Sequence, residues 1–382
     1  MVRALALLAT AAVLCHFSSV ANAGPLEITL VQKQGVEQNF AGFVRRAYQV
    51  TAAGDWAPGA RESARVSVAR PACNVTVAKT GPANYRTVQA AINGIPGNRG
   101  TKLWIICVKA GVYKEKVRVP STATYVQMWG WSLDPNKVEI TWGDTAGTRG
   151  PGGSPLGTYN SYTFAVEADY FSAYYMMIRN TAPRPADGAV GGQAVAARLT
   201  ANYVSFFRCH FTGYQDTLYC HQGIHYFKNC YVRGSVDFIF GNGTVLFLKC
   251  QLYADVVTKG YLTAQNQAKP SEGTGFVIRE GAISGTGLVY LGRAWGLASR
   301  VVFAKVFMSK IIAPVGWDNW GKPTDAIFYG EYKCYGSGAE EGRRASWAFQ
   351  LTDAQARPFM SSNWIKARTW MPAAGIIPAA LP

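Results

Sequence analysis

Three short stretches in the middle of the chain, FRCHF (207–211), FKNCYV (227–232) and FLKCQL (247–252), share one pattern. Their cysteines, Cys209, Cys230 and Cys250, are 21 and 20 residues apart, and aromatic or aliphatic residues alternate around each of them. An earlier segment, MIRNT (177–181), fits the same template with Asn180 at the cysteine position. A repeat of about 20 residues with this alternation and with glycines between the stretches is typical of a solenoid.

The type of solenoid follows by comparison with the known repeats. Helical repeats are longer and need apolar residues at i, i+3, i+4 and i+7, which this region lacks. Leucine-rich repeats have a leucine and asparagine consensus that is absent here. The sequence therefore predicts an all-β fold, a right-handed parallel β-helix, in which successive coils stack about 4.8 Å apart. We expect a short capping helix over 87–92 and short helices and loops over 351–370.

The composition sets the class of partner. The 382 residues are 49% hydrophobic and only 16% charged, so the chain is globular, and its 40 glycines favour many tight turns over an all-helical fold. The formal net charge is +16, which predicts a polyanionic partner. Nucleic acid, anionic lipid and acidic polysaccharide all fit that charge.

The N-terminus has the pattern of a secretory signal peptide over residues 1–23. Arg3 precedes an apolar run (4–15), and a small-x-small cleavage site follows at 21–23. An uncleaved anchor is the alternative. Secretion would exclude most nuclear and cytosolic roles and favours an extracellular polyanion, and no later stretch is long enough to span a membrane. We predict an N-terminal extension over 24–72 and one domain over 73–382.

The cysteines and sequons leave several possibilities open. Seven cysteines follow the signal peptide, and stacked cysteines on adjacent coils could form disulfides or stay free. Cys220, His221 and His225 could suggest a metal site, but a strand or loop does not bring i and i+4 to one face, so packing roles are favoured. Of two glycosylation sequons, the one at Asn74 lies near an expected surface end and could be glycosylated, whereas the one at Asn242 closely follows the apolar stretch 238–240 and could be inaccessible.

Two aspartates recur with the repeat. Asp216 in GYQDTLY (213–219) and Asp237 in GSVDFIFG (234–241) each follow a repeat cysteine by seven residues. Stacked coils would bring the two carboxylates side by side. At that distance each negative charge disfavours the other, so the pKa of one carboxyl group rises, and the pair can supply an acid and a base or nucleophile. An aspartate ladder that caps turns, or a set of calcium ligands, is the alternative.

Neighbouring segments supply other parts of a site. Gln193 in QAVA (193–196) and Gln215 offer amide donors that suit an oxyanion hole. LGRAWG (291–296) offers Arg293, which could hold a carboxylate ionised, and Trp295, which could stack on a sugar ring. An ordinary salt bridge with a core aromatic would give the same spacing.

At these residues the sequence resembles the plant-type pectin methylesterases, or pectinesterases. The matching segments keep the family's order over about residues 75–370, and together they are far more specific than any one of them. They are GVYKE (111–115), QAVA (193–196), GYQDTLY (213–219), GSVDFIFG (234–241) and LGRAWG (291–296). The segment 24–72 is too short for the inhibitor-like pro-domain of many members, so we expect a member without one.

The resemblance implies a β-helix that hydrolyses methyl esters of galacturonan to carboxylate and methanol through an aspartyl acyl-enzyme. Asp237 would be the nucleophile, Asp216 the acid and then the base, and Arg293 the group that orients Asp237. The remaining implied roles are oxyanion stabilisation by Gln193 and Gln215 and substrate contacts by Gln193, Arg293, Trp295 and Thr158. The family's usual proline is Ala294 here, and YLTAQNQ (261–267) keeps only the Thr-Ala-Gln core.

The resemblance also sets the expected partners. We expect esterified pectin as substrate, a proteinaceous pectinesterase inhibitor as a second partner, a secreted monomer in the cell wall, and no cofactor, metal or nucleic acid. Polygalacturonases and pectate lyases share the fold, but their Asp-Asp pair, His-Gly dipeptide or calcium ligands are missing here, and no G-x-S-x-G elbow of a serine esterase is present. A catalytically silent pectin-binding wall protein is the non-enzymatic alternative.

Overall fold

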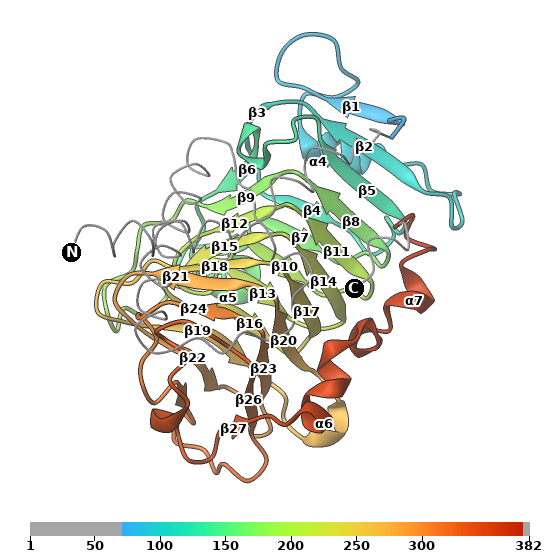
Figure 1. Cartoon of the computed structure of the whole chain (residues 1–382). Helices are drawn as coiled ribbons and strands as arrows, with labels where there is room; N and C mark the ends of the chain where they lie inside the picture. Colours follow the sequence, from blue (N-terminus) through green and yellow to red (C-terminus); the bar gives the residue numbers. More distant parts are fainter. Residues whose placement is uncertain (1–70, 377–382) are drawn as a thin grey trace, which may run out of the picture. The chain divides into compact units, whose positions relative to one another are not determined.

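The computed structural model describes residues 71–376, so the predicted signal peptide (1–23) and nearly all of the predicted extension (24–72) lie outside the described residues. Within 71–376, strands form three parallel sheets of eleven, eight and eight members, here named A, B and C (Figure 1). The chain visits A, then B, then C, so one coil adds one strand to each sheet. Because such parallel connections are right-handed, the predicted right-handed parallel β-helix is confirmed. None of the helices in this range has the length and apolar composition of a membrane span.

The strands are short, as expected for coils of this size. Sheet A contains β1 (Val75–Val77), β2 (Trp104–Val108), β5 (Val126–Gly130), β8 (Phe171–Tyr174), β11 (Val204–Phe207), β14 (Ile224–Lys228), β17 (Thr244–Leu248), β20 (Gly275–Arg279), β23 (Arg300–Ala304), β26 (Phe328–Tyr332) and β27 (Phe349–Gln350). Sheet B contains β3 (Gly111–Lys114), β6 (Val138–Trp142), β9 (Met177–Asn180), β12 (His210–Thr212), β15 (Tyr231–Gly234), β18 (Gln251–Ala254), β21 (Ala282–Gly285) and β24 (Phe307–Met308). Sheet C contains β4 (Val117–Val119), β7 (Phe164–Val166), β10 (Ala197–Leu199), β13 (Leu218–Cys220), β16 (Val236–Gly241), β19 (Lys259–Gln265), β22 (Leu288–Ala294) and β25 (Trp317–Asp318).

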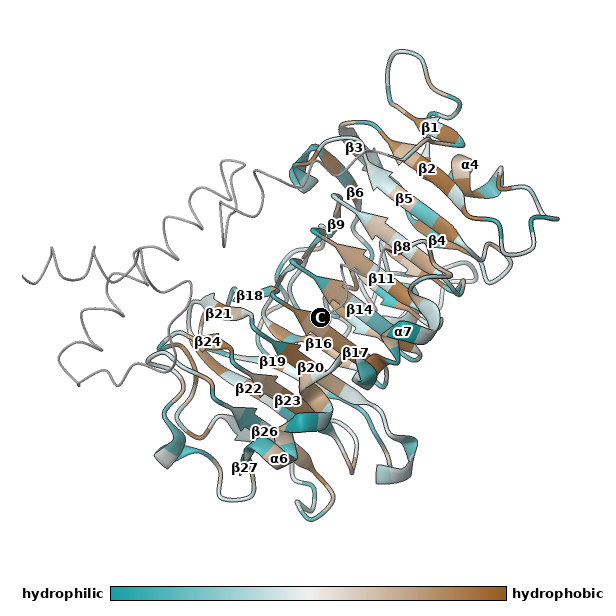
Figure 2. Ribbon diagram, turned by 45° about the vertical axis from the view of Figure 1, so that its right-hand side comes forward, coloured by the Kyte–Doolittle hydropathy of each residue, from teal (hydrophilic) through white to brown (hydrophobic). Residues whose placement is uncertain are grey.

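The core is the inside of the coil and is filled by alternate residues of most strands. Figure 2 shows hydrophobic residues, in brown, along many of the strands. Because parallel strands pair in register, like residues stack on like residues from coil to coil. In sheet A, Phe206, Phe227 and Phe247 are register partners whose rings stack with centroids 5.4 and 4.6 Å apart. Each such ring pair adds about 0.5–1.5 kcal/mol beyond the area that it buries.

The turn from sheet A to sheet B explains the repeat seen in the sequence. At this turn, each of seven coils has one non-glycine residue with a positive φ, and the residue types differ widely: Tyr175, Arg208, Asn229, Lys249, Glu280, Lys305 and Lys333. The residue that follows this turn lies inside the coil, and register aligns these positions as Met176, Cys209, Cys230, Cys250, Gly281, Val306 and Cys334. The cysteine repeat is therefore one part of a longer ladder of equivalent positions, most of them buried.

The assignment of Asn180 to the cysteine position is wrong. Met177 pairs with His210, so Met176 occupies the position of Cys209. The Asn180 amide instead donates to the carbonyls of Asp144, Ser161 and Val195 at 2.8–3.1 Å. Methionine is flexible enough to fill a buried position that cysteine occupies in other coils, but it does not match the cysteine template, so a local pattern match chose the wrong residue.

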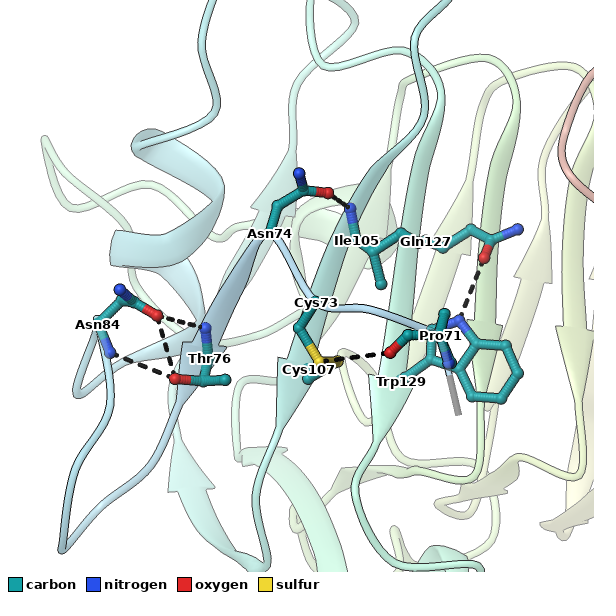
Figure 3. Close-up of a disulfide and its surroundings, with 9 residues drawn as sticks. All are labelled: Pro71, Cys73, Asn74, Thr76, Asn84, Ile105, Cys107, Gln127 and Trp129. Atoms are coloured by element: carbon teal, nitrogen blue, oxygen red, sulfur yellow. Dashed lines mark hydrogen bonds between the residues drawn. A yellow bond between two sulfur atoms is a disulfide. The ribbon is translucent and has the colours of Figure 1, made fainter. Parts of the chain in front are cut away.

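A disulfide joins the first two strands of sheet A. Cys73 and Cys107 form a disulfide that ties β1 to β2, and the Asn74 side chain accepts from the Ile105 N–H at 2.8 Å (Figure 3). The stacked cysteines Cys209, Cys230 and Cys250 are free thiols, as are Cys220 and Cys334.

The predicted capping helix is α4 (Val88–Asn93). The Thr87 hydroxyl caps its N-terminus, and Glu115 accepts from the N–H groups of Val88 and Gln89 at 3.0 Å. A carboxylate at this end is favoured by the helix dipole. The buried face of α4 belongs to the core, so it covers the end of the stack.

The C-terminal segment runs back along the outer face of sheet A, as predicted for 351–370. It contains α6 (Asp353–Ala356), the 3-10 helices η4 (Arg357–Met360) and η5 (Ser362–Ile365), and α7 (Ala367–Trp370). Hydrogen bonds join it to three separate strands: Arg279 of β20 donates to the Met360 carbonyl, Trp364 to the Val245 carbonyl of β17, and Gln127 of β5 to the Ala374 carbonyl. Shorter 3-10 helices lie in loops elsewhere: η1 (Pro135–Lys137), η2 (Pro270–Glu272) and η3 (Glu341–Arg343).

Candidate active site

Two aspartates lie at the starts of strands β13 and β16 on adjacent coils. Leu218 pairs with Ile239, so Asp216 and Asp237, each two residues earlier, occupy equivalent positions. Both have a left-handed backbone, with φ of 63° and 50°, which aspartate tolerates better than most residues. Both are buried, with 8% and 6% of their surface exposed. The repeat therefore brings two carboxyl groups together in a place poorly reached by water.

Arg293 reaches Asp237 across an intervening strand. Phe240, Ala264 and Arg293 are successive register partners on β16, β19 and β22. Strands lie about 4.8 Å apart, so the guanidinium must cross β19, and the methyl side chain of Ala264 leaves room for it. The Arg293 Nε donates to Asp237 Oδ1 at 2.8 Å and Nη2 donates to Oδ2 at 2.5 Å. This two-point contact fixes both the charge and the orientation of the Asp237 carboxylate.

The two carboxyl groups differ in their electrostatics. Burial raises the pKa of Asp216 well above its usual range, and the charge of Asp237 raises it further. Burial also raises the pKa of Asp237, but there the Arg293 hydrogen bonds and charge pull the pKa back down. Asp237 is therefore the first of the pair to ionise, whereas Asp216 is the one that keeps its proton. An acid beside an ionised carboxylate is the arrangement that acid-base and nucleophilic chemistry require.

The two glutamines lie on adjacent coils beside this pair. Gln215 directly precedes Asp216, and Gln193 lies one coil earlier, where the neighbouring Ala194 N–H donates to the Gln215 carbonyl at 3.1 Å. Both side chains are partly exposed. Within residues 71–376, no hydrogen bond occupies either side-chain amide, so both are available to a ligand.

Trp295 and Thr158 lie farther out. Trp295 follows the end of β22, is 37% exposed, and its ring centroid is 6.2 Å from that of Phe240. Thr158 lies on α5 (Gly157–Asn160), and the next residue, Tyr159, covers the buried guanidinium of Arg198 at 3.7 Å. The structure records no contact between Thr158 and the two aspartates among the described residues.

An aromatic row links these parts, and the sequence interpretation missed it. The Tyr219 and Phe240 rings stack with centroids 4.1 Å apart, and Tyr159 packs edge-on against Tyr219 at 6.4 Å. The row runs from Tyr159 through Tyr219 and Phe240 to Trp295 along the outer face of sheet C. The signal was present in the sequence, because each aspartate is followed three residues later by an aromatic residue.

The cluster of Cys220, His221 and His225 is made of packing residues. His225 is fully buried, and its Nε2 lies 3.1 Å from the Ala201 carbonyl. His221 packs edge-on against Tyr219 and Tyr159. Among the described residues, no group of three or more histidine, cysteine, aspartate or glutamate side chains could hold a metal ion.

Residues 74–368 match the sequence profile of the family described as Pectinesterase. The Arabidopsis thaliana protein named Pectinesterase QRT1 is 38% identical over 299 residues, which is 78% of each chain. The solved structure of a pectin methylesterase from carrot superposes with a TM-score of 0.73 at 31% identity and covers 81% of this chain and 98% of its own. A pectin methylesterase solved in complex with a hexasaccharide superposes with a TM-score of 0.66 at 29% identity and covers 78% and 98%.

Proposed function

This chain belongs to the pectinesterase family and is a carboxylic ester hydrolase, and we propose that it demethylates pectin through an aspartyl acyl-enzyme with Asp237 as nucleophile. The observation that carries this mechanism is the asymmetry of the carboxyl pair. Arg293 makes its two-point contact with Asp237, while Asp216 is buried beside them with a raised pKa. One group is thus prepared to attack and the other to donate a proton.

In the first half of the proposed reaction, an Asp237 oxygen attacks the carbonyl carbon of the methyl ester. The carbonyl electrons move to its oxygen, and the amides of Gln193 and Gln215 donate hydrogen bonds to that oxyanion. The bond to the methoxy group then breaks, Asp216 gives its proton to the leaving oxygen, and methanol departs. The galacturonyl group remains on Asp237 as an acyl-enzyme.

In the second half, Asp216 is ionised and takes a proton from a water molecule that attacks the acyl carbon. The bond to Asp237 breaks, the galacturonate carboxyl group is released, and Asp216 is again protonated. Proton and charge return to their starting positions, so the cycle needs no cofactor or metal.

For the substrate, we propose methyl-esterified homogalacturonan bound along the aromatic row, with Trp295 and Thr158 as contacts. Supporting this, a structural relative is described in complex with a hexasaccharide, and aromatic faces suit sugar rings. The net charge of +16 also favours a polyanionic polymer and predicts retention on it that weakens as salt rises.

For location, we propose a protein secreted to the cell wall after cleavage near Gly24, with the catalytic domain at 73–382. The Cys73–Cys107 disulfide supports an oxidising compartment. N-terminal sequencing of protein recovered from culture medium tests this proposal, because retention of Arg3 would contradict cleavage.

We further propose that the secreted protein carries a glycan on Asn74 but not on Asn242. Asn74 is exposed, and its hydrogen bond uses only the side-chain oxygen. The Asn242 amide nitrogen donates to Glu272 at 2.8 Å, and its oxygen accepts from Thr274 at 2.6 Å. Peptide mass spectrometry before and after removal of N-glycans would reveal which asparagine is modified.

We propose that the enzyme acts as a monomer and that a proteinaceous pectinesterase inhibitor binds it. Light scattering of the purified protein reports the first property. Loss of methanol release on adding such an inhibitor reports the second.

The central test measures methanol release from highly esterified pectin by the wild type, Asp237→Asn and Asp216→Asn. We expect each variant to lose at least about 100-fold in kcat, because each lacks a group needed in every turnover. Asp325→Asn is the control, because this exposed residue lies outside the site and its replacement should preserve activity. A folded wild type that binds pectin but releases no methanol would instead identify a silent binding protein, and full activity in Asp237→Asn would refute the mechanism.

A further inference from the structure

The guanidinium of Arg293 packs against two aromatic rings. Its central carbon lies 4.4 Å from the ring centroid of Tyr261 on β19 and 3.7 Å from that of Trp320, which follows β25. A planar cation over aromatic faces is attracted to them, so both rings favour one position of the guanidinium. In that position it makes its two hydrogen bonds to Asp237.

Asp318 accepts a hydrogen bond from each of the two residues that carry these rings. The Tyr261 hydroxyl donates to Asp318 Oδ2 at 2.9 Å, and the Trp320 backbone N–H donates to Asp318 Oδ1 at 2.8 Å. Trp320 has a φ of 51°, a left-handed conformation that a bulky side chain rarely adopts without such support. The two oxygens of Asp318 therefore hold the Tyr261 hydroxyl and the backbone of Trp320, the two residues whose rings contact Arg293.

The same arrangement explains which carboxylate Arg293 binds. Asp318 is the register partner of Arg293 on the adjacent strand, one strand away, whereas Asp237 is two strands away. Within the described residues, the ion pair of Arg293 is with Asp237 and not with this nearer carboxylate. Asp318 instead accepts hydrogen bonds from Tyr261 and Trp320. The Arg293 guanidinium therefore extends past Ala264 and binds Asp237.

We propose that Asp318, through Tyr261 and Trp320, is a positioning residue that aims Arg293 at Asp237. It acts on the chemistry without touching the substrate, so it should support kcat far more than it supports KM. The inference rests on the proposed function, because it takes Asp237 as the nucleophile.

The sharpest test is Tyr261→Phe, which removes only the hydroxyl that Asp318 holds and keeps the ring. We expect kcat to fall about tenfold, equivalent to ~1.4 kcal/mol, with KM changed by less than about twofold. Tyr290→Phe is the matched control, because Tyr290 is the register partner of Tyr261 and stacks on it at 5.1 Å, yet it lies outside the contact with Asp318. The control should keep the wild-type kcat.

A double-mutant cycle separates positioning from a structural role. If Tyr261 acts through the guanidinium, then Tyr261→Phe should lose most of its effect on kcat when Arg293 is already lysine. Asp318→Ala, which frees both rings, should give a larger loss than Tyr261→Phe and the same lack of additivity with Arg293→Lys. Thermal unfolding of every variant is measured alongside.

Three results would overturn the proposal. They are an unchanged kcat in both Tyr261→Phe and Asp318→Ala, a rise in KM at constant kcat, and full additivity with Arg293→Lys. Failure of the proposed function is recognised separately, because then the wild type itself releases no methanol in the same assay.

Discussion

Replacing Arg293 with methionine should cost the enzyme about 100-fold in kcat/KM and move its activity to higher pH. Only 17% of the Arg293 side chain and 9% of the Asp237 side chain are exposed, and two hydrogen bonds join them. Removing one partner of such a buried pair costs about 3–5 kcal/mol, because the other charge is left uncompensated. About 3 kcal/mol expressed in the transition state corresponds to roughly 100-fold.

The direction of the pH effect follows from the charges around Asp237. Burial and the Asp318 carboxylate raise the pKa of Asp237, and Arg293 opposes them. Without the guanidinium the pKa rises further, so the nucleophile is protonated over more of the acidic range. The acidic limb of the kcat/KM profile should therefore lie at higher pH in Arg293→Met than in the wild type.

The assay is methanol release from esterified pectin over a range of pH, at constant ionic strength. Arg198→Met is the matched control, because Arg198 lies in the same outer row of sheet C, is buried, and pairs with Glu167 at 2.5 Å. It should lower the free energy of unfolding but leave the acidic limb in place. A kcat/KM for Arg293→Met within about threefold of the wild type, or an acidic limb that stays or moves to lower pH, would refute the reasoning.

Further predictions concern the paired acid, the crossing point and the C-terminal segment. The folded-state pKa of Asp216 lies above its unfolded value, so the unfolded chain loses this proton first as pH rises. Asp216 therefore lowers the free energy of unfolding above the ordinary pKa of about 3.9, and the loss is complete above the folded pKa. Asp216→Asn should accordingly raise Tm at neutral pH, and the gain should vanish near pH 3 in calorimetry; a gain that persists there would contradict this. Ala264→Leu should obstruct the Arg293 guanidinium, so kcat should fall about tenfold or more while Ala264→Gly stays near wild type in the methanol assay. Trp370→Ala should lower the free energy of unfolding by about 3–5 kcal/mol in urea titration, because the indole is buried and donates to the Ile365 carbonyl. Its kcat should be unchanged, since this residue covers sheet A, and a reduced kcat in the folded variant would count against that separation.

The fold and the pairing of Asp216 with Asp237 could both be predicted from the amino-acid sequence. The spacing of Cys209, Cys230 and Cys250 indicated the coil, and the same spacing carried Asp216 and Asp237 to equivalent positions. These inferences hold because a parallel β-helix repeats its register from coil to coil, so distance along the chain converts directly into a position in the stack.

The same reasoning failed where coils differ in length or residue type. Asn180 was aligned with the cysteines, although Met176 occupies that place, and Cys334 was not recognised as a member of the ladder. Loops of variable length separate these coils, so the period is lost in the sequence while the stacking persists in space. The fold preserves the inward-facing position in each coil, which many residue types can occupy.

The family resemblance already implied that Arg293 orients Asp237, but the physical reason for this choice lies in side chains that meet only in the folded chain. Asp318 is nearer to it in the sheet, and nothing in the sequence links Tyr261 to Asp318, 57 residues away. The choice arises because the hydroxyl of Tyr261 and the backbone of Trp320 occupy Asp318, while the small Ala264 opens the path to Asp237. Side chains from β16, β19, β22 and the turn after β25 must come together before that preference exists, so no single segment encodes it.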